Sequence, residues 1–249
     1  MTAHADRMSD SMTPTRQAEP RSGPAPRKPW YQPLVYWFCH HAAALVFILI
    51  YRVRAFHPER VPSRGAVLIA ANHQSFFDPP LVGSMIQSRQ VSFVAKSGLF
   101  SFGPFAWLIR TLNSVPIRED TGDAGAIKEV LRRLATDDAV VIFPEGSRTP
   151  DGAMHEFKRG VALLVKRADC PVVPVAVEGV FDAWPIHRKL PRFFGQRLAV
   201  MYGEPIDSRE LMAQGPDAAL RRLESEVSAM REQLRVYLRE SSPAWPNRA

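Results

Sequence analysis

Two polar runs in this 249-residue chain each follow an apolar, strand-like segment. The first run, Asn72-His73-Gln74-Ser75-Phe76-Phe77-Asp78, places an imidazole and a carboxylate five positions apart. A base with an acid that orients it is the minimum equipment for activating a hydroxyl group. The second run, Phe143-Pro144-Glu145-Gly146-Ser147-Arg148, places an arginine beside glycine and serine, which suits an anionic ligand.

The position of His73 favours a role in catalysis. It follows the apolar run 66–71, and ligands in open α/β sheets bind beyond the carboxyl ends of the strands. Asp78 could accept a hydrogen bond from the second ring nitrogen of His73, fixing its tautomer and stabilising the imidazolium. Asp78 also precedes Pro79 and is placed to cap the next helix. Taken alone, His73 could equally be structural, and the run 145–148 could be a surface turn.

Four motifs in order resemble the conserved blocks of the lysophosphatidate (1-acyl-sn-glycerol-3-phosphate) acyltransferases, in the glycerolipid acyltransferase superfamily. The blocks are N-H-x4-D at 72–78, Val115-Pro116-Ile117-Arg118, Phe143-Pro144-Glu145-Gly146-Ser147-Arg148 and Val173-Pro174-Val175-Ala176. The resemblance spans about residues 57–210 and includes Ala95-Lys96-Ser97, Phe157-Lys158-Arg159-Gly160 and Gly203-Glu204-Pro205-Ile206. One departure is Asn113-Ser114, which stands where the second block commonly begins with glycine.

The resemblance implies an O-acyltransferase that makes phosphatidate from lysophosphatidate. His73 and Asp78 would be the catalytic pair. The acceptor's phosphate and glycerol would be bound by a second set of residues: Arg118, Glu145, Gly146, Ser147, Arg148 and Lys158. Glu145 would contact the glycerol or hold Arg148. The co-substrate would be acyl-CoA or acyl-carrier protein, and no cofactor or metal is expected.

Motifs of other chemistries are missing from the sequence. It contains no G-x-S-x-G elbow, no P-loop and no G-x-G-x-x-G, and His155-Glu156 lacks the second histidine of H-E-x-x-H. Direct attack by the acceptor hydroxyl is the mechanism that remains. Two alternatives stay open: a sibling enzyme for glycerol 3-phosphate or another lysolipid, and a non-catalytic basic lipid-binding protein.

Composition and charge favour an anionic partner. The chain is 46% apolar and 23% charged, with a net charge of +7 and a pI of about 9.8. Nucleic acid, an acidic membrane surface and phosphorylated substrates all fit that charge. A nucleic-acid partner is not expected, because it would leave the apolar run from Tyr31 to Tyr51 unexplained. The two cysteines, Cys39 and Cys170, favour a reducing, intracellular setting over a disulfide framework.

The amino-terminal part divides into a polar tail and an apolar segment. Residues 1–30 are expected to be a disordered, basic and proline-rich tail. Residues 31–56 are expected to be a membrane-associated segment, because Tyr31 to Tyr51 contains no charged residue and is long enough as a helix to cross a bilayer. His40 and His41 in its middle leave a span, an in-plane helix and a re-entrant segment open, and a buried helix is the further alternative. The expected location is the cytoplasmic face of the cell membrane.

After residue 57 the pattern alternates between short apolar runs and longer amphipathic ones. Strands are predicted at 66–71, 91–95, 114–117, 139–143, 172–177 and 198–202, and helices at 81–87, 104–112, 123–136, 160–167 and 217–239. The segment 114–117 contains a proline and is predicted to be an edge strand. This alternation predicts an α/β acyltransferase domain over residues 57–249, with a mostly parallel central sheet flanked by helices and an amphipathic helix at its end.

Overall fold

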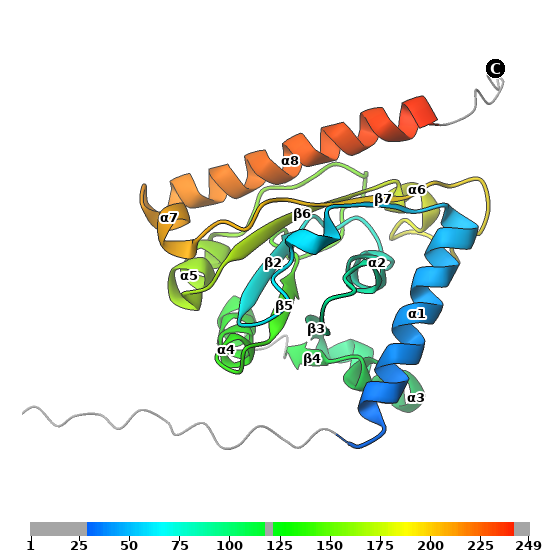
Figure 1. The fold of residues 1–249 in the computed structure, drawn as a ribbon, viewed down its shortest axis with the longest axis horizontal. Coiled ribbons are helices and arrows are strands. Elements are labelled where there is room, and N and C mark those ends of the chain that lie inside the picture. Colours follow the sequence, from blue (N-terminus) through cyan, green and yellow to red (C-terminus); the bar gives the residue numbers. More distant parts are fainter. Residues whose placement is uncertain (1–28, 118–121, 242–249) are drawn as a thin grey trace, which may run out of the picture. The chain divides into compact units, whose positions relative to one another are not determined.

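The computed structural model describes residues 29–117 and 122–241. The described residues from Tyr31 onward form one compact unit, so the apolar segment after Tyr31 belongs to the same unit as the strands and helices that follow it. The predicted tail lies almost entirely outside the described residues. The unit is built on a seven-stranded sheet with the order β1-β7-β6-β2-β5-β3-β4 (Figure 1).

The sheet is mostly parallel, as predicted. Its strands are β1 (Arg54–Phe56), β2 (Val67–Ala71), β3 (Val91–Lys96), β4 (Ser114–Ile117), β5 (Ala139–Ile142), β6 (Val172–Glu178) and β7 (Ala199–Tyr202). Strand β7 runs antiparallel to β6, and β1 runs parallel to β7. The two strands at this edge therefore run opposite to the other five. Strand β4 forms the opposite edge, where Pro116, which has no N–H group, is tolerated.

Helices cover both faces of the sheet (Figure 1). The α-helices are α1 (Gln32–Tyr51), α2 (Asp78–Met85), α3 (Gly103–Thr111), α4 (Gly122–Leu134), α5 (Arg159–Ala168), α6 (Val180–Ala183), α7 (Ser208–Met212) and α8 (Pro216–Ser241). Short 3₁₀ turns, η1 and η2, occupy Pro58–Arg60 and Ser97–Phe100. In β2 the side chains alternate. Leu68 and Ala70 pack with α4, α5 and α8, whereas Val67, Ile69 and Ala71 pack with α1 and α2.

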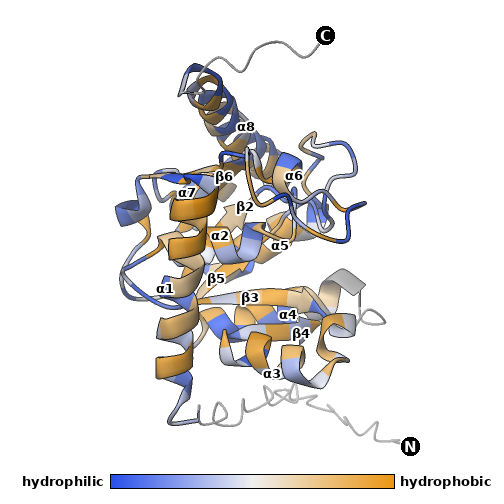
Figure 2. Cartoon of the chain, turned by 90° about the vertical axis from the view of Figure 1, so that its right-hand side faces the viewer, coloured by the Kyte–Doolittle hydropathy of each residue, from blue (hydrophilic) through white to orange (hydrophobic). Residues whose placement is uncertain are grey.

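Helix α1 is neither wholly buried nor wholly exposed. Ala44, Phe47 and Tyr51 are buried against the domain, with Tyr51 fully enclosed. The opposite face exposes large apolar side chains, among them Phe38 and Leu49, which are 66% and 67% exposed. This helix is long and apolar enough to cross a membrane, by length and composition alone. Figure 2 views the molecule from this side, with α1 in front and α3 beside its lower end.

One local expectation was wrong. The cap position of α2 is Phe77, and Asp78 is already the first helical residue. The carboxylate of Asp78 does not cap this helix, because it accepts hydrogen bonds from the segment before it, at His73, Gln74 and Ser75.

Candidate active site

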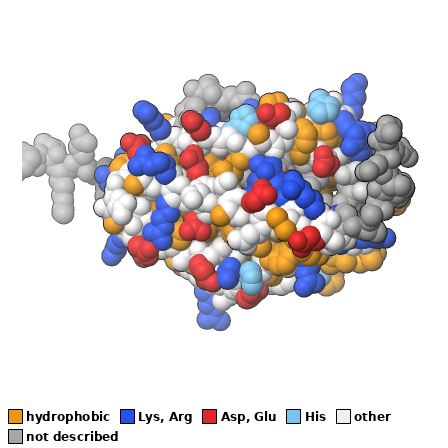
Figure 3. Space-filling view, turned by 90° about the horizontal axis from the view of Figure 1, so that it is seen from above, with side chains coloured by type: hydrophobic (Ala, Val, Ile, Leu, Met, Phe, Trp, Pro, Cys, Tyr) orange, Lys and Arg blue, Asp and Glu red, His pale blue; other side chains and the backbone are white. Residues whose placement is uncertain are grey.

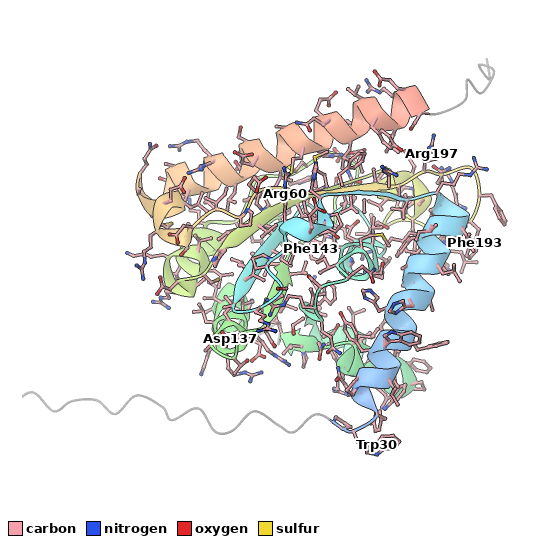
Figure 4. The ribbon with its side chains drawn as sticks, viewed as in Figure 1. Trp30, Arg60, Asp137, Phe143, Phe193 and Arg197 are labelled. Atoms are coloured by element: carbon pink, nitrogen blue, oxygen red, sulfur yellow. The ribbon has the colours of Figure 1, made fainter. Side chains whose placement is uncertain are left out.

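Three neighbouring parallel strands end at the candidate site. His73 lies two residues beyond the end of β2, Phe143 follows β5 on one side of it, and Glu178 ends β6 on the other. Figure 4 labels Phe143 in the interior of the unit. Its ring stacks on the His73 imidazole with 4.0 Å between centroids and 19° between planes. The aromatic face therefore limits rotation of the imidazole.

His73 and Asp78 form the predicted pair. Nδ1 of His73 lies 2.7 Å from Oδ2 of Asp78. The side chain of Asp78 is fully buried, while that of His73 is 17% exposed. Because Nδ1 faces the carboxylate, the hydrogen bond assigns its proton there and leaves Nε2 as the basic nitrogen. The segment between them is a tight turn that leads directly into α2, which is how five residues bring the two groups together.

The carboxylate of Asp78 is held by more than the imidazole. Oδ2 also accepts hydrogen bonds from the backbone N–H groups of Gln74 and Ser75, at 2.6 and 2.7 Å. Burial raises the pKa of Asp78, and the hydrogen bonds from His73, Ser75 and Gln74 act in the opposite direction. Three donors on one oxygen fix the carboxylate in place before any substrate binds.

Glu145 also holds the His73 segment in place, through hydrogen bonds from backbone N–H groups. Its Oε1 accepts the backbone N–H of His73 at 2.7 Å, and its Oε2 accepts that of His155 at 2.9 Å. The residue is only 6% exposed, and burial raises the pKa of its carboxyl group. Glu145 thus joins three segments of the site through backbone hydrogen bonds. Neither of those bonds involves Arg148.

Arg148 lies beside the catalytic pair and has unused hydrogen-bonding capacity. Its guanidinium carbon is 3.4 Å from the centroid of the Phe76 ring, which holds the group by a cation–π contact. Its Nη1 is buried and donates no hydrogen bond within the described residues. Burial lowers the pKa of Arg148, and the charge of Asp78 opposes that change. A fixed, unsaturated cation near His73 suits an anionic substrate.

Lys158 and the turn 146–147 are brought together with Arg148. Gly146 has a φ of +74°, which favours glycine, and a Cβ built there would lie 2.7 Å from Lys158 Nζ. The Lys158 side chain therefore crosses the face of this turn. Ser147 is exposed at the rim. Arg118, the remaining predicted phosphate ligand, lies outside the described residues.

Sequence reasoning missed the residues that shape the turn. The amide of Asn72 is fully buried and exchanges two hydrogen bonds with the backbone of Val177, at 2.8 and 3.1 Å, joining β2 to β6. Ser75 donates from Oγ to the carbonyl oxygen of Trp184 at 2.8 Å. For Asn72 the signal was available, since it is a polar residue directly after a buried strand and therefore needs hydrogen-bond partners.

Comparisons with known proteins identify the family of this chain. The acyltransferase family model matches residues 52–178, just over half of the chain. A 1-acyl-sn-glycerol-3-phosphate acyltransferase of Streptococcus pneumoniae is 24% identical over 215 residues, covering 83% of this chain and 78% of that protein. The alpha form from Bos taurus is 31% identical over 178 residues, covering 66% and 60%.

The fold also has a solved counterpart. The crystal structure of the 1-acyl-sn-glycerophosphate acyltransferase of Thermotoga maritima superposes with a TM-score of 0.68, at 24% identity, over 87% of this chain and 81% of that one. The family model and the curated relatives confirm the resemblance drawn from the four sequence motifs. With its family model matched from β1 to the end of β6, this chain belongs to the acyltransferase family and is an O-acyltransferase.

Proposed function

We propose that this enzyme transfers an acyl group to the free hydroxyl of 1-acyl-sn-glycerol 3-phosphate and so produces phosphatidate. The observation that carries the proposal is the His73–Asp78 pair beside Arg148, whose buried Nη1 makes no hydrogen bond within the described part of the chain. The first group can activate a hydroxyl and the second can bind a phosphate. The relatives named above, which act on this acceptor by name, support the choice of substrate.

In the proposed mechanism His73 acts as a general base. Its Nε2 removes the proton of the acceptor hydroxyl as the oxygen attacks the thioester carbonyl carbon, while Asp78 stabilises the imidazolium through Nδ1. The tetrahedral intermediate collapses, the C–S bond breaks, and the thiolate takes the proton back from His73. The step is balanced without a cofactor or metal. Acyl-CoA and acyl-carrier protein both supply the required thioester.

The cationic residues would orient the acceptor. Arg148, Lys158 and Arg118 are the proposed phosphate ligands, and docking the phosphate places the glycerol hydroxyl near His73. Gly146 and Ser147 would contribute the turn over which the phosphate lies. Glu145, with both carboxylate oxygens bonded to backbone N–H groups, would act by holding this turn beside the His73 segment.

Membrane attachment fits the same proposal, because lysophosphatidate is a lipid. The outer face of α1 exposes a row of apolar side chains, and further ones lie on α3 and on the loop 186–194. Phe193 is on the same side of the molecule as α1 (Figure 4). Burial of this side in a bilayer, with basic residues of the loop at the headgroups, would bring the enzyme to its substrate. The cytoplasmic face is proposed because both thioester donors are water-soluble carriers.

A reconstituted assay tests this function. The purified full-length protein is bound to anionic liposomes and offered labelled acyl-CoA or acyl-carrier protein with lysophosphatidate, glycerol 3-phosphate or lysophosphatidylcholine. We expect transfer to lysophosphatidate at a kcat/KM well above that for the other acceptors. A higher kcat/KM for another acceptor would show that this acceptor, and not lysophosphatidate, is the substrate. Binding of the protein to the liposomes without transfer to any acceptor would favour the non-catalytic lipid-binding alternative.

His73→Ala is the matched control for the mechanism. Loss of a general base alone lowers the rate by about 10²–10⁴-fold. We expect His73→Ala to show a loss of this size and to remain folded. Asp78→Asn should also be severe, because it favours the wrong tautomer of the imidazole. Turnover close to that of the unaltered enzyme in His73→Ala would exclude general-base catalysis by this residue.

A further inference from the structure

A buried arginine on the last helix lies behind the active site. Arg231 of α8 is 4% exposed, although arginine is rarely so buried unless it is paired. Its Nε donates to Oε2 of Glu178, the last residue of β6, at 2.5 Å. The region that carries the resemblance to acyltransferases ends before this helix, so none of the four motifs contains Arg231.

The same guanidinium contacts two further segments of the site. Its Nη2 donates to the carbonyl oxygen of Gly152. With the amide of Gln74 turned so that its oxygen faces the arginine, that oxygen accepts from Nη2 at 2.5 Å and from Nε at 3.2 Å. Gln74 is itself 1% exposed and directly follows His73. One side chain of α8 therefore bonds to residues 74, 152 and 178.

Each segment that Arg231 contacts is joined by a further hydrogen bond to the segment that carries His73 and Asp78. The backbone N–H of Gln74 donates to the same Asp78 oxygen that binds His73. The segment after Arg148 contains both Gly152 and Thr149, whose N–H donates to the carbonyl oxygen of His73 at 3.0 Å. Glu178 follows Val177, which is bonded to the Asn72 side chain.

Stability alone is a poor explanation for this arrangement. Replacing a buried ion pair by apolar residues of similar volume is often neutral or stabilising, because both charges lose their hydration on burial. What a planar guanidinium provides is a fixed set of donor directions that three carbonyl or carboxylate oxygens can share. Such geometry sets the distance between segments that belong to different parts of the chain.

We infer that Arg231 is a positioning residue for the acyl transfer. It holds the turn that carries His73 and Asp78 at a fixed distance from the segment that carries Arg148, so that base and phosphate ligand engage one acceptor molecule together. A misplacement of about 1 Å can lower a rate by about 10²-fold. The inference deepens the proposed function and rests on it for its kinetic test only.

The experiment compares four variants of the full-length enzyme on liposomes: Arg231→Met, Arg231→Lys, Arg231→Met with Glu178→Leu, and Arg235→Met. Arg235 is the matched control, because it lies on the same helix and contacts Glu178 at 3.4 Å but contacts neither Gln74 nor Gly152 by any hydrogen bond of the described chain. Kinetics with lysophosphatidate and thermal unfolding are measured, together with backbone hydrogen exchange over residues 73–78 and 149–156.

We expect Arg231→Met to lower kcat on the order of 10²-fold with little change in KM. It should also lower the Tm by roughly 10 °C, because the largely buried Glu178 loses its closest partner and keeps only the 3.4 Å contact with Arg235. The double variant should recover most of the Tm and none of the kcat, Arg231→Lys should recover part of the kcat, and Arg235→Met should retain both. Exchange at 73–78 and 149–156 should rise in both variants that carry the Arg231→Met substitution.

A structural role would give a different pattern. Recovery of kcat with Tm in the double variant, or exchange at 73–78 and 149–156 equal to that of Arg235→Met, would overturn the inference. An unaltered enzyme that does not acylate lysophosphatidate would instead refute the proposed function. The exchange measurement would still decide the role of Arg231, since it needs no substrate.

Discussion

At the scale of single residues, the site is organised by carboxylates that bind backbone N–H groups. Oδ2 of Asp78 takes two such hydrogen bonds beside the one from His73, and Glu145 takes one on each oxygen. The pairing of His73 with Asp78 was predictable, because five residues separate them and the turn is local. The bond from His73 to Glu145 and the contact of Gln74 with Arg231 were not, because these partners lie far apart in sequence.

Arg148→Ala should weaken acceptor binding. Loss of a hydrogen bond to a charged group costs about 1.5–3 kcal/mol, which corresponds to a rise in the KM for lysophosphatidate of roughly 10- to 150-fold. Some fall in kcat should accompany it, because a loosely held acceptor misaligns its hydroxyl. Initial rates with varied acceptor and varied donor measure both constants, and Arg118→Ala should behave alike. A rise confined to the KM of the donor would assign these arginines to the thioester carrier.

Glu145 should impose a pH dependence on stability. Burial raises its pKa in the folded state, so the folded protein binds a proton that the unfolded chain releases at lower pH. Its contribution to the free energy of unfolding is therefore complete below the ordinary glutamate pKa and declines as the pH rises through the raised value. The slope for one proton cannot exceed about 1.4 kcal/mol per pH unit.

Urea unfolding of the unaltered protein and of Glu145→Gln at several pH values between about 4 and 8 tests this slope. The difference in unfolding free energy between the two proteins should shrink as the pH rises. A constant or growing difference would contradict a raised pKa at Glu145.

At the scale of elements, hydrophobic periodicity predicted the long helices and the buried strands. All six predicted strands and all five predicted helices after residue 57 have counterparts, with ends shifted by at most three residues. The elements that were missed are the short ones: β1, η1, η2, α6 and α7. Segments of three to five residues carry too little periodicity to be recognised. Strand β1 in addition depends on pairing with β7, which lies far away in the sequence.

Two fully buried tyrosines differ in the hydrogen bonding of their hydroxyl groups. Tyr202 of β7 donates from its hydroxyl to the carbonyl oxygen of Val82 in α2 at 2.7 Å. The hydroxyl of Tyr51, at the end of α1, is buried without a partner among the described residues. Tyr202→Phe should therefore lower the free energy of unfolding by about 1–2 kcal/mol, since the carbonyl loses its donor.

Tyr51→Phe should be neutral or stabilising, because it removes a buried polar atom that has no hydrogen bond. Chemical denaturation of the two single variants makes the comparison, and each is the control for the other. Equal destabilisation by the two substitutions would show that the hydroxyl of Tyr51 has a partner in solution.

At the scale of the whole unit, polar and apolar surfaces lie on different sides. Over α8, basic and acidic side chains are interspersed, so the net charge of +7 does not form one patch there (Figure 3). The side formed by α1, α3 and the loop 186–194 instead exposes tryptophan, phenylalanine and leucine. Helix α1 is hydrophobic along most of its length (Figure 2). The sequence predicted the apolar segment but not its division into faces. Tyr31 to Tyr51 contains no charged residue, and packing against the domain, chiefly against α2, separates the two faces.

That division yields a test of attachment that leaves the core intact. Phe38, Leu45 and Leu49 are more than half exposed on α1, whereas Phe47 and Tyr51 are buried beneath them. Replacing the three exposed residues with serine should remove a large apolar area from the bilayer and shift the enzyme towards the soluble fraction, without lowering its Tm. Leu163→Ser with Val236→Ser is the control, because both residues are exposed apolar side chains on α5 and α8.

Flotation with anionic liposomes at low and high salt measures the attachment. The triple variant should retain only weak binding that high salt abolishes, because basic residues of the loop 186–194 attract anionic headgroups over a screening length of about 8–10 Å. Deletion of residues 1–28 should change flotation little at either salt concentration. Salt-resistant flotation of the triple variant equal to that of the control would place the main lipid contact outside α1, on α3 or on the loop.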